Sequence, residues 1–250
     1  MRRSALLDGA GLVHGFGDRR DGVSGGVYAH ANAGFNGDDP AAVRANRARF
    51  ARAAGAPPDA LCTLRQVHGR TARVVAAPEQ GRRDGDALVS RTPGLLLAVT
   101  TADCVPVLIA DPSAGVAAAV HAGWRGAVAG VVEAAVAAMV ELGAEPARLV
   151  GAIGPCIRRH AYEVDAPLRT RVLTATPAAV EWFAPGFRPE RWQFDLPGYV
   201  ASLLRAAGAF RIDDLGLDTL HNATIYFSHR RSKQSGEVGY GVQLSGIRVP

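Results

Sequence analysis

Residues 95–124 read LLLAVTTADCVPVLIADPSAGVAAAVHAGW, and this stretch contains three short apolar runs separated by Asp, Pro and Gly: residues 95–100, 105–110 and 116–121. Apolar runs of this length, bounded by turn residues, are typical of strands buried on both faces of a sheet. Cys104 and His121 fall at the ends of these runs or in the adjoining turns. The stretch therefore predicts three buried strands, with two metal-compatible side chains at strand ends or in the adjoining turns.

Helical patterns flank this central stretch on both sides. Capping residues, apolar spacing of three and four, and terminal Gly or Pro predict helices over residues 40–54, 124–142, 165–173 and 197–207. Further strands are expected at residues 61–67, 71–77, 149–153, 222–227 and 238–244. The glycine-dense residues 10–37 are expected to form short strands with tight turns. Because strands and helices are mixed without regular alternation, the pattern predicts an α+β fold with mixed β-sheets.

The composition is that of a globular protein with one continuous domain over residues 1–250. The chain has 250 residues, 48% of them hydrophobic and 20% charged, which is enough to bury a large core. Gly and Pro are spread as turn punctuation, and we find no internal repeat or long linker. We therefore expect a single domain and, since no long apolar stripe is left over, a monomer.

The charge pattern gives no sign of a nucleic-acid partner. The formal net charge is +5, with Lys233 the only lysine among 28 basic residues, but the arginine doublets are scattered and the aromatic content is 6%. Nucleic-acid binding surfaces usually show a basic stripe with stacking residues. The chain contains no run of about 20 apolar residues, so we expect no membrane-spanning segment. The three cysteines are too few and too irregular for a disulfide framework, which favours a cytoplasmic protein.

Three short segments concentrate side chains that could ligate a metal ion: residues 65–69, 101–107 and 120–126. They contain His68, Cys104 and His121, each beside an expected turn. Two imidazoles and one thiolate suit Zn²⁺ and leave one tetrahedral position open, as in catalytic zinc sites. Cu(I) is a weaker alternative that accepts the same ligands.

The spacing of these segments leaves other interpretations open. Cys104 could be an inert buried thiol beside two hydrogen-bonded histidines. It could also be a nucleophile with His121 or His68 as its base and Asp103 as the orienting group, as in cysteine hydrolases. Metal ligation and nucleophilic attack compete for the same thiolate.

An ordered set of motifs extends along nearly the whole chain: Asp21-Gly22-Val23-Ser24, Asn32-Ala33-Gly34, Gly37-Asp38, Asn46-Arg47, Gln66-Val67-His68-Gly69, Asp84-Gly85-Asp86-Ala87-Leu88, Thr101-Ala102-Asp103-Cys104-Val105-Pro106-Val107, His121-Ala122-Gly123-Trp124-Arg125-Gly126, Gly154-Pro155-Cys156-Ile157, Tyr162-Glu163-Val164 and Phe227-Ser228-His229-Arg230-Arg231. This set resembles the YfiH-type family, formerly named the laccase-domain or multicopper polyphenol oxidase family and now described as purine nucleoside phosphorylases.

The resemblance implies a single YfiH-like domain in which His68, Cys104 and His121 hold a zinc ion. It implies phosphorolysis of adenosine, inosine, guanosine or methylthioadenosine, together with adenosine deamination. A peptidoglycan-editing role is also attributed to relatives, and a cysteine-dependent hydrolase acting through Cys104 remains the alternative. The older oxidase name fits poorly, because a four-copper centre needs about ten histidines and this chain has seven.

Phosphorolysis requires an oxyanion clamp, for which arginine forks are well suited. Arg19, Arg65 and Arg230 are the candidates, with Arg65 also a candidate catalytic residue and Gln66 a candidate substrate contact. Asp103 is expected to carry protons or to hydrogen-bond a ligand imidazole.

Other polar side chains are expected to have no part in the site. Cys62 and Cys156 are predicted to be structural thiols, and His14, His30 and His160 to be exposed or hydrogen-bonded residues rather than ligands.

His229 stands where many relatives of the family carry Tyr, which places a titratable group near the expected site.

Overall fold

Two β-sheets pack face to face in the computed structural model, which describes all residues from 1 to 250. The first sheet has the strand order β1 (His14–Phe16), β14 (Gln243–Arg248), β6 (Leu96–Thr101), β2 (Leu61–Arg65) and β4 (Gln80–Asp84). The second has the order β13 (Arg211–Asp214), β9 (Val150–Ile153), β7 (Val105–Asp111), β8 (Val116–Ala122), β5 (Ala87–Ser90) and β3 (Ala72–Val74). Parallel and antiparallel pairs occur in both sheets, so both are mixed.

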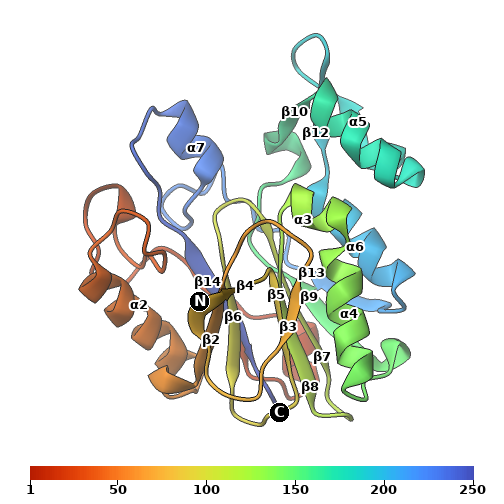
Figure 1. Cartoon of the computed structure of the whole chain (residues 1–250). Coiled ribbons are helices and arrows are strands. Elements are labelled where there is room, and N and C mark those ends of the chain that lie inside the picture. The colour runs from red at the N-terminus through yellow and green to blue at the C-terminus, as the bar shows by residue number, and fades with distance from the viewer.

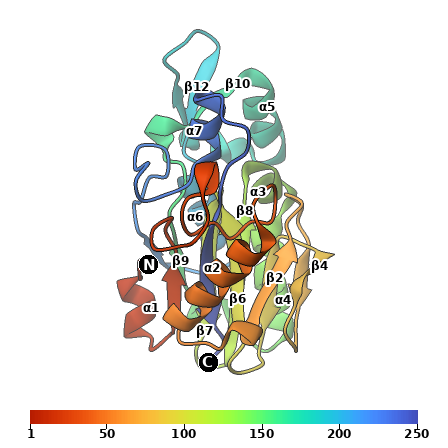
Figure 2. The same ribbon diagram turned by 90° about the vertical axis from the view of Figure 1, so that its left-hand side faces the viewer.

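Helices cover the outer faces of this sandwich. Figure 1 shows α2 on one side of the sheets and α4 on the other, and Figure 2 views the molecule with α2 toward the reader. The helices are α1 (Ala5–Gly9), α2 (Pro40–Ala53), α3 (Trp124–Ala129), α4 (Val131–Glu141), α5 (Ala166–Ala175), α6 (Leu196–Ala206) and α7 (His229–Gln234). Short 3-10 turns are η1 (Gly26–Tyr28), η2 (Pro58–Ala60), η3 (Pro146–Arg148), η4 (Arg159–Ala161) and η5 (Pro177–Trp182).

A small third sheet stands beyond one end of the sandwich. It consists of β10 (Glu163–Asp165), β12 (Arg191–Phe194) and β11 (Phe183–Pro185). In both ribbon views β10, β12 and α5 project from the same end as α7. None of the helices combines the length and the hydrophobicity needed to span a lipid bilayer.

Alternation along the central strands creates separate apolar layers. On β7, Val107 and Ile109 pack against α4 and α6, whereas Leu108 and Ala110 face the other sheet. Successive side chains of a strand point to opposite faces, so a continuous apolar run must be covered on both. A third cluster lies between α2 and the outer face of the first sheet, where Leu96 and Leu244 meet the helix. The resulting order of layers is helix, sheet, sheet and helices.

The α+β class, the mixed sheets and the three central strands are confirmed by this architecture. The helix expected over residues 40–54 is also confirmed: Asp39 accepts hydrogen bonds from the backbone N–H groups of Ala41 and Ala42, and Pro40 occupies the first turn.

Several local expectations are wrong. The helix expected over residues 124–142 is divided into α3 and α4 by Gly130, whose φ of +95° is left-handed and interrupts the hydrogen-bond ladder. Residues 10–37 contain only one strand, β1, and residues 222–227 contain none. The last strand, β14, begins five residues later than expected, and residues 238–242 before it have no regular secondary structure. Strands β4, β5 and β13, the third sheet, and helices α1 and α7 have no counterpart among the elements expected from the sequence.

Candidate functional site

His68, Cys104 and His121 converge at one end of the two sheets. His68 follows β2 in a left-handed turn with φ +58°, Cys104 directly precedes β7, and His121 lies near the end of β8. Because β7 and β8 are antiparallel and Pro106 is paired with His121, the start of one strand meets the end of the other. Nε2 of His68 lies 3.8 Å from Sγ of Cys104, and the three ligand atoms all lie within 4.8 Å of one another. The structure therefore brings together the three residues proposed as ligands.

The Asp86 carboxylate holds both histidines in position through hydrogen bonds. Its Oδ1 accepts hydrogen bonds from Nδ1 of His121 at 2.8 Å and from the backbone N–H of His68 at 2.9 Å. Its Oδ2 accepts from the backbone N–H of Gly69 at 2.7 Å. Asp86 is fully buried, and these partners compensate the burial of its charge. One side chain thus sets the orientation of the His121 ring and the shape of the turn that carries His68.

Cys104 and His121 stabilise each other's charged forms. Burial by itself raises the pKa of the Cys104 thiol, but the charge of His121 and hydrogen bonds from both imidazoles outweigh it and hold this pKa at about 6. Burial lowers the pKa of His121, but the Cys104 thiolate and the Asp86 carboxylate outweigh it and raise this pKa to about 9. At neutral pH Cys104 is therefore a thiolate, which is the form that binds metals and attacks electrophiles.

The donor set and the space around it fit a zinc ion. One thiolate and two imidazoles are the ligands that Zn²⁺ prefers, and a three-residue set leaves one position open. Gly123 keeps this space free: a Cβ built there would lie 2.9 Å from Sγ of Cys104 and 3.0 Å from Cδ2 of His68. Any larger residue at this position would push into the donor atoms.

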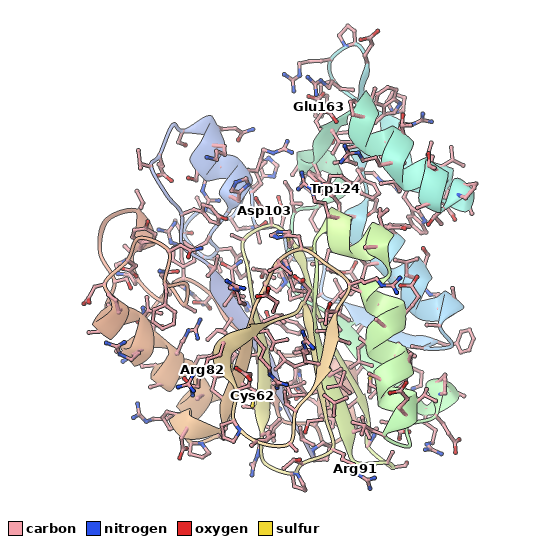
Figure 3. All side chains as sticks on the ribbon, in the orientation of Figure 1. Cys62, Arg82, Arg91, Asp103, Trp124 and Glu163 are labelled. Atoms are coloured by element: carbon pink, nitrogen blue, oxygen red, sulfur yellow. The ribbon has the colours of Figure 1, made fainter.

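A cavity of about 390 Å³ opens above His68 and Cys104. Its walls come from α3, α7 and the segment that precedes β10, and they combine aromatic and cationic side chains. Figure 3 shows the labelled Asp103 and Trp124, the first residue of α3, at this end of the sheets. A smaller cavity of about 220 Å³ shares His68, Cys104 and Tyr240 with the first. Pockets with an apolar wall and a few convergent polar groups are typical of small-molecule sites.

Asp103 is committed to contacts within the chain. Its Oδ1 accepts a hydrogen bond from the Thr219 hydroxyl at 2.6 Å, and its Oδ2 accepts from the backbone N–H of Arg230 at 2.6 Å. With φ +87°, it turns the chain between β6 and β7 so that Cys104 faces the cavity. No imidazole is bonded to Asp103, so the role of orienting a ligand histidine considered for it belongs to Asp86.

Of the three arginines considered as oxyanion clamps, Arg230 lies on the wall of the larger cavity. Its guanidinium stacks over the Tyr162 ring at 5.2 Å and donates to the carbonyl of Glu163 at 3.0 Å. Arg65 is 69% exposed and is paired with Asp84 away from both cavities.

Two further residues named from the sequence are held by backbone groups. The guanidinium of Arg19 donates to the carbonyls of Ala29 and Ala223, which ties two loops together. Gln66 bonds the backbone of Thr100 at 2.8 Å through both its amide nitrogen and its carbonyl oxygen, and it lines the smaller cavity. The structure thus brings Arg230 and Gln66 to the site and leaves Arg19 and Arg65 outside it.

Four residues of the site were given no role in the sequence analysis. Asp86 supports both histidines, and three cavity residues, Arg125, Tyr162 and Tyr240, supply a charge and two phenols. Burial raises the pKa of Tyr162 and of Tyr240, so both remain neutral hydrogen-bond donors. Asp86, Arg125 and Tyr162 stand in motifs quoted above, and the available signal for Asp86 was a carboxylate directly before the apolar residues Ala87-Leu88-Val89.

His229 lines the larger cavity, as expected from the sequence, and the two remaining thiols lie elsewhere. Cys62 and Cys156 are fully buried, and burial raises the pKa of both thiols, that of Cys156 to about 12. His14 is buried and bonded at both ring nitrogens. A cavity of about 470 Å³ between α2 and the N-terminal segment contains neither cysteine nor histidine.

Comparison with known proteins adds a family to this geometry. The family model described as multi-copper polyphenol oxidoreductase laccase matches residues 13–248. A purine nucleoside phosphorylase of Streptomyces coelicolor is 44% identical over 237 residues, covering 92% of this chain and 95% of the relative. A purine nucleoside phosphorylase of Deinococcus radiodurans is 42% identical over 229 residues, covering 91% of this chain and 86% of the relative.

Solved structures agree with the fold described above. YlmD from Geobacillus stearothermophilus superposes with a TM-score of 0.84 at 30% identity, covering 96% of this chain and 92% of that one. The Bacillus licheniformis protein YfiH gives a TM-score of 0.86 at 25% identity, covering 96% and 93%. The curated relatives of this chain are named purine nucleoside phosphorylases. The α+β sandwich with its convergent histidines and cysteine, and these matches over most of its length, show that the chain belongs to the laccase-like YfiH family.

Proposed function

We propose that the protein is a zinc-containing purine nucleoside phosphorylase that converts a purine nucleoside and phosphate into the free base and ribose 1-phosphate. The observation that carries this proposal is the convergence of His68, Cys104 and His121 beneath a cavity lined by aromatic and cationic side chains. The names of the curated relatives support the reaction class.

The donor atoms of His68, Cys104 and His121 would hold the metal, with Asp86 keeping the His121 ring in place. Zinc held there would supply a Lewis acid for the hydrolytic deamination of adenosine, in which water adds to the ring carbon bearing the amino group and ammonia leaves. The chain's own contribution is to fix the ligands and to leave a substrate-sized space above them.

In phosphorolysis, an oxygen of phosphate forms a bond to the anomeric carbon of ribose, and the bond to the purine nitrogen breaks with its electron pair leaving on the base. Arg230 and Arg125 provide positive charge on the cavity wall for phosphate, while the Trp124 and Tyr162 rings offer faces for a planar base. Such groups act by positioning the reactants and stabilising charge. Adenosine, inosine, guanosine and methylthioadenosine share this purine and ribose framework, so all four are proposed substrates, with adenosine deamination as a second activity.

A second candidate function uses Cys104 as a nucleophile, in a hydrolase or a peptidoglycan-editing enzyme. The observation that favours it is the proximity of Cys104 to two imidazoles, with Sγ 3.8 Å from Nε2 of His68 and the charge of His121 lowering the pKa of the thiol. A thiolate beside an imidazolium is the arrangement that activates cysteine in covalent catalysis. Because one thiolate cannot bind zinc and attack a substrate at the same time, the metal content separates the two functions.

The experiment combines metal analysis with a nucleoside panel. Protein purified without a histidine tag is expected to hold zinc at the site, and each of the four nucleosides is incubated with and without phosphate while base and ribose 1-phosphate are quantified. Cys104→Ala should abolish both metal binding at the site and phosphorolysis. Cys62→Ala is the matched control, since Cys62 is a buried thiol outside the site, and it should retain both.

Two results would contradict the proposal. One is formation of free base that does not depend on phosphate in the active protein. The other is full zinc occupancy at the site after Cys104→Ala, since two imidazoles rarely retain zinc in water.

A further inference from the structure

A second cluster of metal-compatible side chains lies outside the site described above. It consists of His160 in η4 and of Asp218 and His221 in the segment after β13, and its three donor atoms lie within 4.8 Å of one another. Nε2 of His160 is 3.3 Å from Oδ2 of Asp218, and Nδ1 of His221 is 2.5 Å from the same oxygen. Residues from two distant parts of the chain thus direct ring nitrogens at one carboxylate oxygen.

The two imidazole rings are prearranged on one side of this oxygen. They are stacked with centroids 5.2 Å apart and an interplanar angle of 21°. Oδ1 of Asp218 accepts the backbone N–H of Leu220 at 3.0 Å, which accounts for the turn that holds the carboxylate in place. That turn does not account for the approach of His160, which comes from another segment.

The spacing of the donors suits one shared ion. Metal–nitrogen and metal–oxygen bonds in zinc sites are about 2.0–2.2 Å long, so two ligand atoms on one tetrahedral ion lie roughly 3.4 Å apart. The 3.3 Å distance from His160 to Oδ2 is close to that value, whereas the 2.5 Å contact from His221 is a hydrogen bond that opens when an ion is bound. The His160 and His221 side chains are 64% and 59% exposed, so small rotations of both rings can admit an ion without disturbing the core.

We propose that His160, Asp218 and His221 form a second metal site that binds a divalent late transition-metal ion such as Zn²⁺. Two imidazoles and one carboxylate favour zinc, nickel or cobalt over magnesium and calcium, which prefer oxygen ligands. The set contains no sulfur, and its exposure leaves the remaining coordination positions to water. His160, which the sequence analysis expected not to be a ligand, is a ligand in this proposal.

The position of the cluster connects it to the walls of the cavity. The residue that follows η4 is Tyr162, and the residue that follows Asp218 is Thr219, whose hydroxyl is bonded to Asp103. A metal ion bound by His160 and Asp218 therefore links the segment carrying Tyr162 to the segment that holds the turn before Cys104. The second site acts as a clamp that stiffens the cavity rather than as a place of chemistry.

The test is a titration of metal-stripped, full-length protein with Zn²⁺, followed by removal of free metal and measurement of bound zinc per chain. The unaltered protein should bind two equivalents, and His160→Ala or His221→Ala should each bind one. His30→Ala, which removes another exposed histidine, is the matched control and should still bind two. Cys104→Ala should bind one, and the double variant Cys104→Ala with His160→Ala should bind none.

Cobalt provides a readout that distinguishes the two sites. Co²⁺ bound with Cys104 gives thiolate-to-metal charge-transfer absorption, whereas Co²⁺ at the sulfur-free second site adds only weak visible bands. His160→Ala should therefore lose the second equivalent and keep the charge-transfer absorption in full, whatever nucleosides the protein acts on. If the unaltered protein binds only the sulfur-ligated equivalent, or if the His160→Ala and His221→Ala proteins still bind two, the second site does not exist.

Discussion

Nδ1 of His121 lies 2.8 Å from Oδ1 of Asp86, and the two side chains are 3% and 0% exposed. A carboxylate can only accept a hydrogen bond, so the ring carries a proton on Nδ1 and presents Nε2 toward Cys104. The same carboxylate bonds the backbone of His68 and Gly69. Asp86 therefore couples the orientation of the His121 ring to the backbone position of His68, and both are proposed ligands.

Removing the negative charge of Asp86 should weaken zinc binding and leave the cavity unchanged. Asp86→Asn is expected to lower zinc affinity about 10- to 100-fold, because an amide orients and polarises the imidazole less well than a carboxylate. Competition with a chromophoric chelator measures the effect. Asp84→Asn alters a nearby exposed carboxylate paired with Arg65 and should leave the affinity unchanged. Equal affinities for the two variants would show that Asp86 has no positioning role.

Adding a methyl group at Gly123 should weaken zinc binding at the same site. In Gly123→Ala the new Cβ would meet Sγ of Cys104 at 2.9 Å and Cδ2 of His68 at 3.0 Å, so the donors must separate. The backbone there, with φ −69°, accepts alanine, and thermal stability should change little. We expect zinc affinity to fall at least about tenfold, as for other perturbations of ligand orientation. Gly25→Ala, where the added Cβ meets no atom within 4 Å, is the control, and a Gly123→Ala protein that binds zinc normally would contradict the steric argument.

The three cysteines should differ sharply in reactivity once the metal is stripped. Iodoacetamide at neutral pH should modify Cys104, whose pKa of about 6 makes it a thiolate, while Cys62 and Cys156 stay unmodified because burial raises the pKa of both. The rate at Cys104 should fall as the pH drops below about 6, since protonation removes the thiolate. Peptide mass spectrometry locates the modified residue, and added zinc should protect it. Equal modification of Cys156 and Cys104 would refute this difference.

The arginines proposed as phosphate clamps can be ranked by their positions. Arg230→Ala should raise KM for phosphate more than KM for the nucleoside, with a loss of about 2–3 kcal/mol in transition-state binding if a charged hydrogen bond is removed. Arg65→Ala should have a smaller effect, because Arg65 is paired with Asp84 outside the cavities. Steady-state kinetics with each substrate varied in turn decides between them. A larger phosphate effect in Arg65→Ala would reverse this ranking.

Mild acid should destabilise the fold through His14. Its Nε2 accepts the backbone N–H of Ser4 at 2.8 Å and its Nδ1 donates to the Leu12 carbonyl, so the folded protein needs the neutral ring. Burial lowers the pKa of His14 below its usual 6.5, which means that the unfolded chain takes up the proton first. The stabilisation is complete above pH 6.5 and is lost as the pH falls from there through the folded-state pKa.

The measurement is the Tm of the protein between pH 7.5 and pH 5. His14→Gln, which cannot be protonated in this range, should show a smaller decrease in Tm than the unaltered protein. His30→Ala, which lacks an exposed histidine instead, should show the same decrease as the unaltered protein. The idea fails if His14→Gln and the unaltered protein lose stability in parallel.

The sequence by itself determined the class of the fold and named His68, Cys104 and His121 as the candidate metal ligands. The strands β6, β7 and β8 could be predicted because each is buried on both faces. A strand buried in this way has apolar residues at consecutive positions, which a sequence shows directly. Asp39 and Pro40 likewise marked the start of α2, since helix capping depends on neighbours along the chain. His68, Cys104 and His121 could be named because each stood at the end of such an element within a family motif.

Only the tertiary structure decided which groups support those ligands. Asp86 was unassigned because its partners, His121 and the turn after β2, come close only when β5 lies beside β8 and β2 folds over them. Arg65 stood next to a ligand in sequence and yet points to Asp84, whereas Arg230, far along the chain, reaches the cavity. Position along a strand is a local property, but hydrogen bonds and cavity walls join segments that the sequence keeps far apart, so their partners are fixed only when the two sheets pack together.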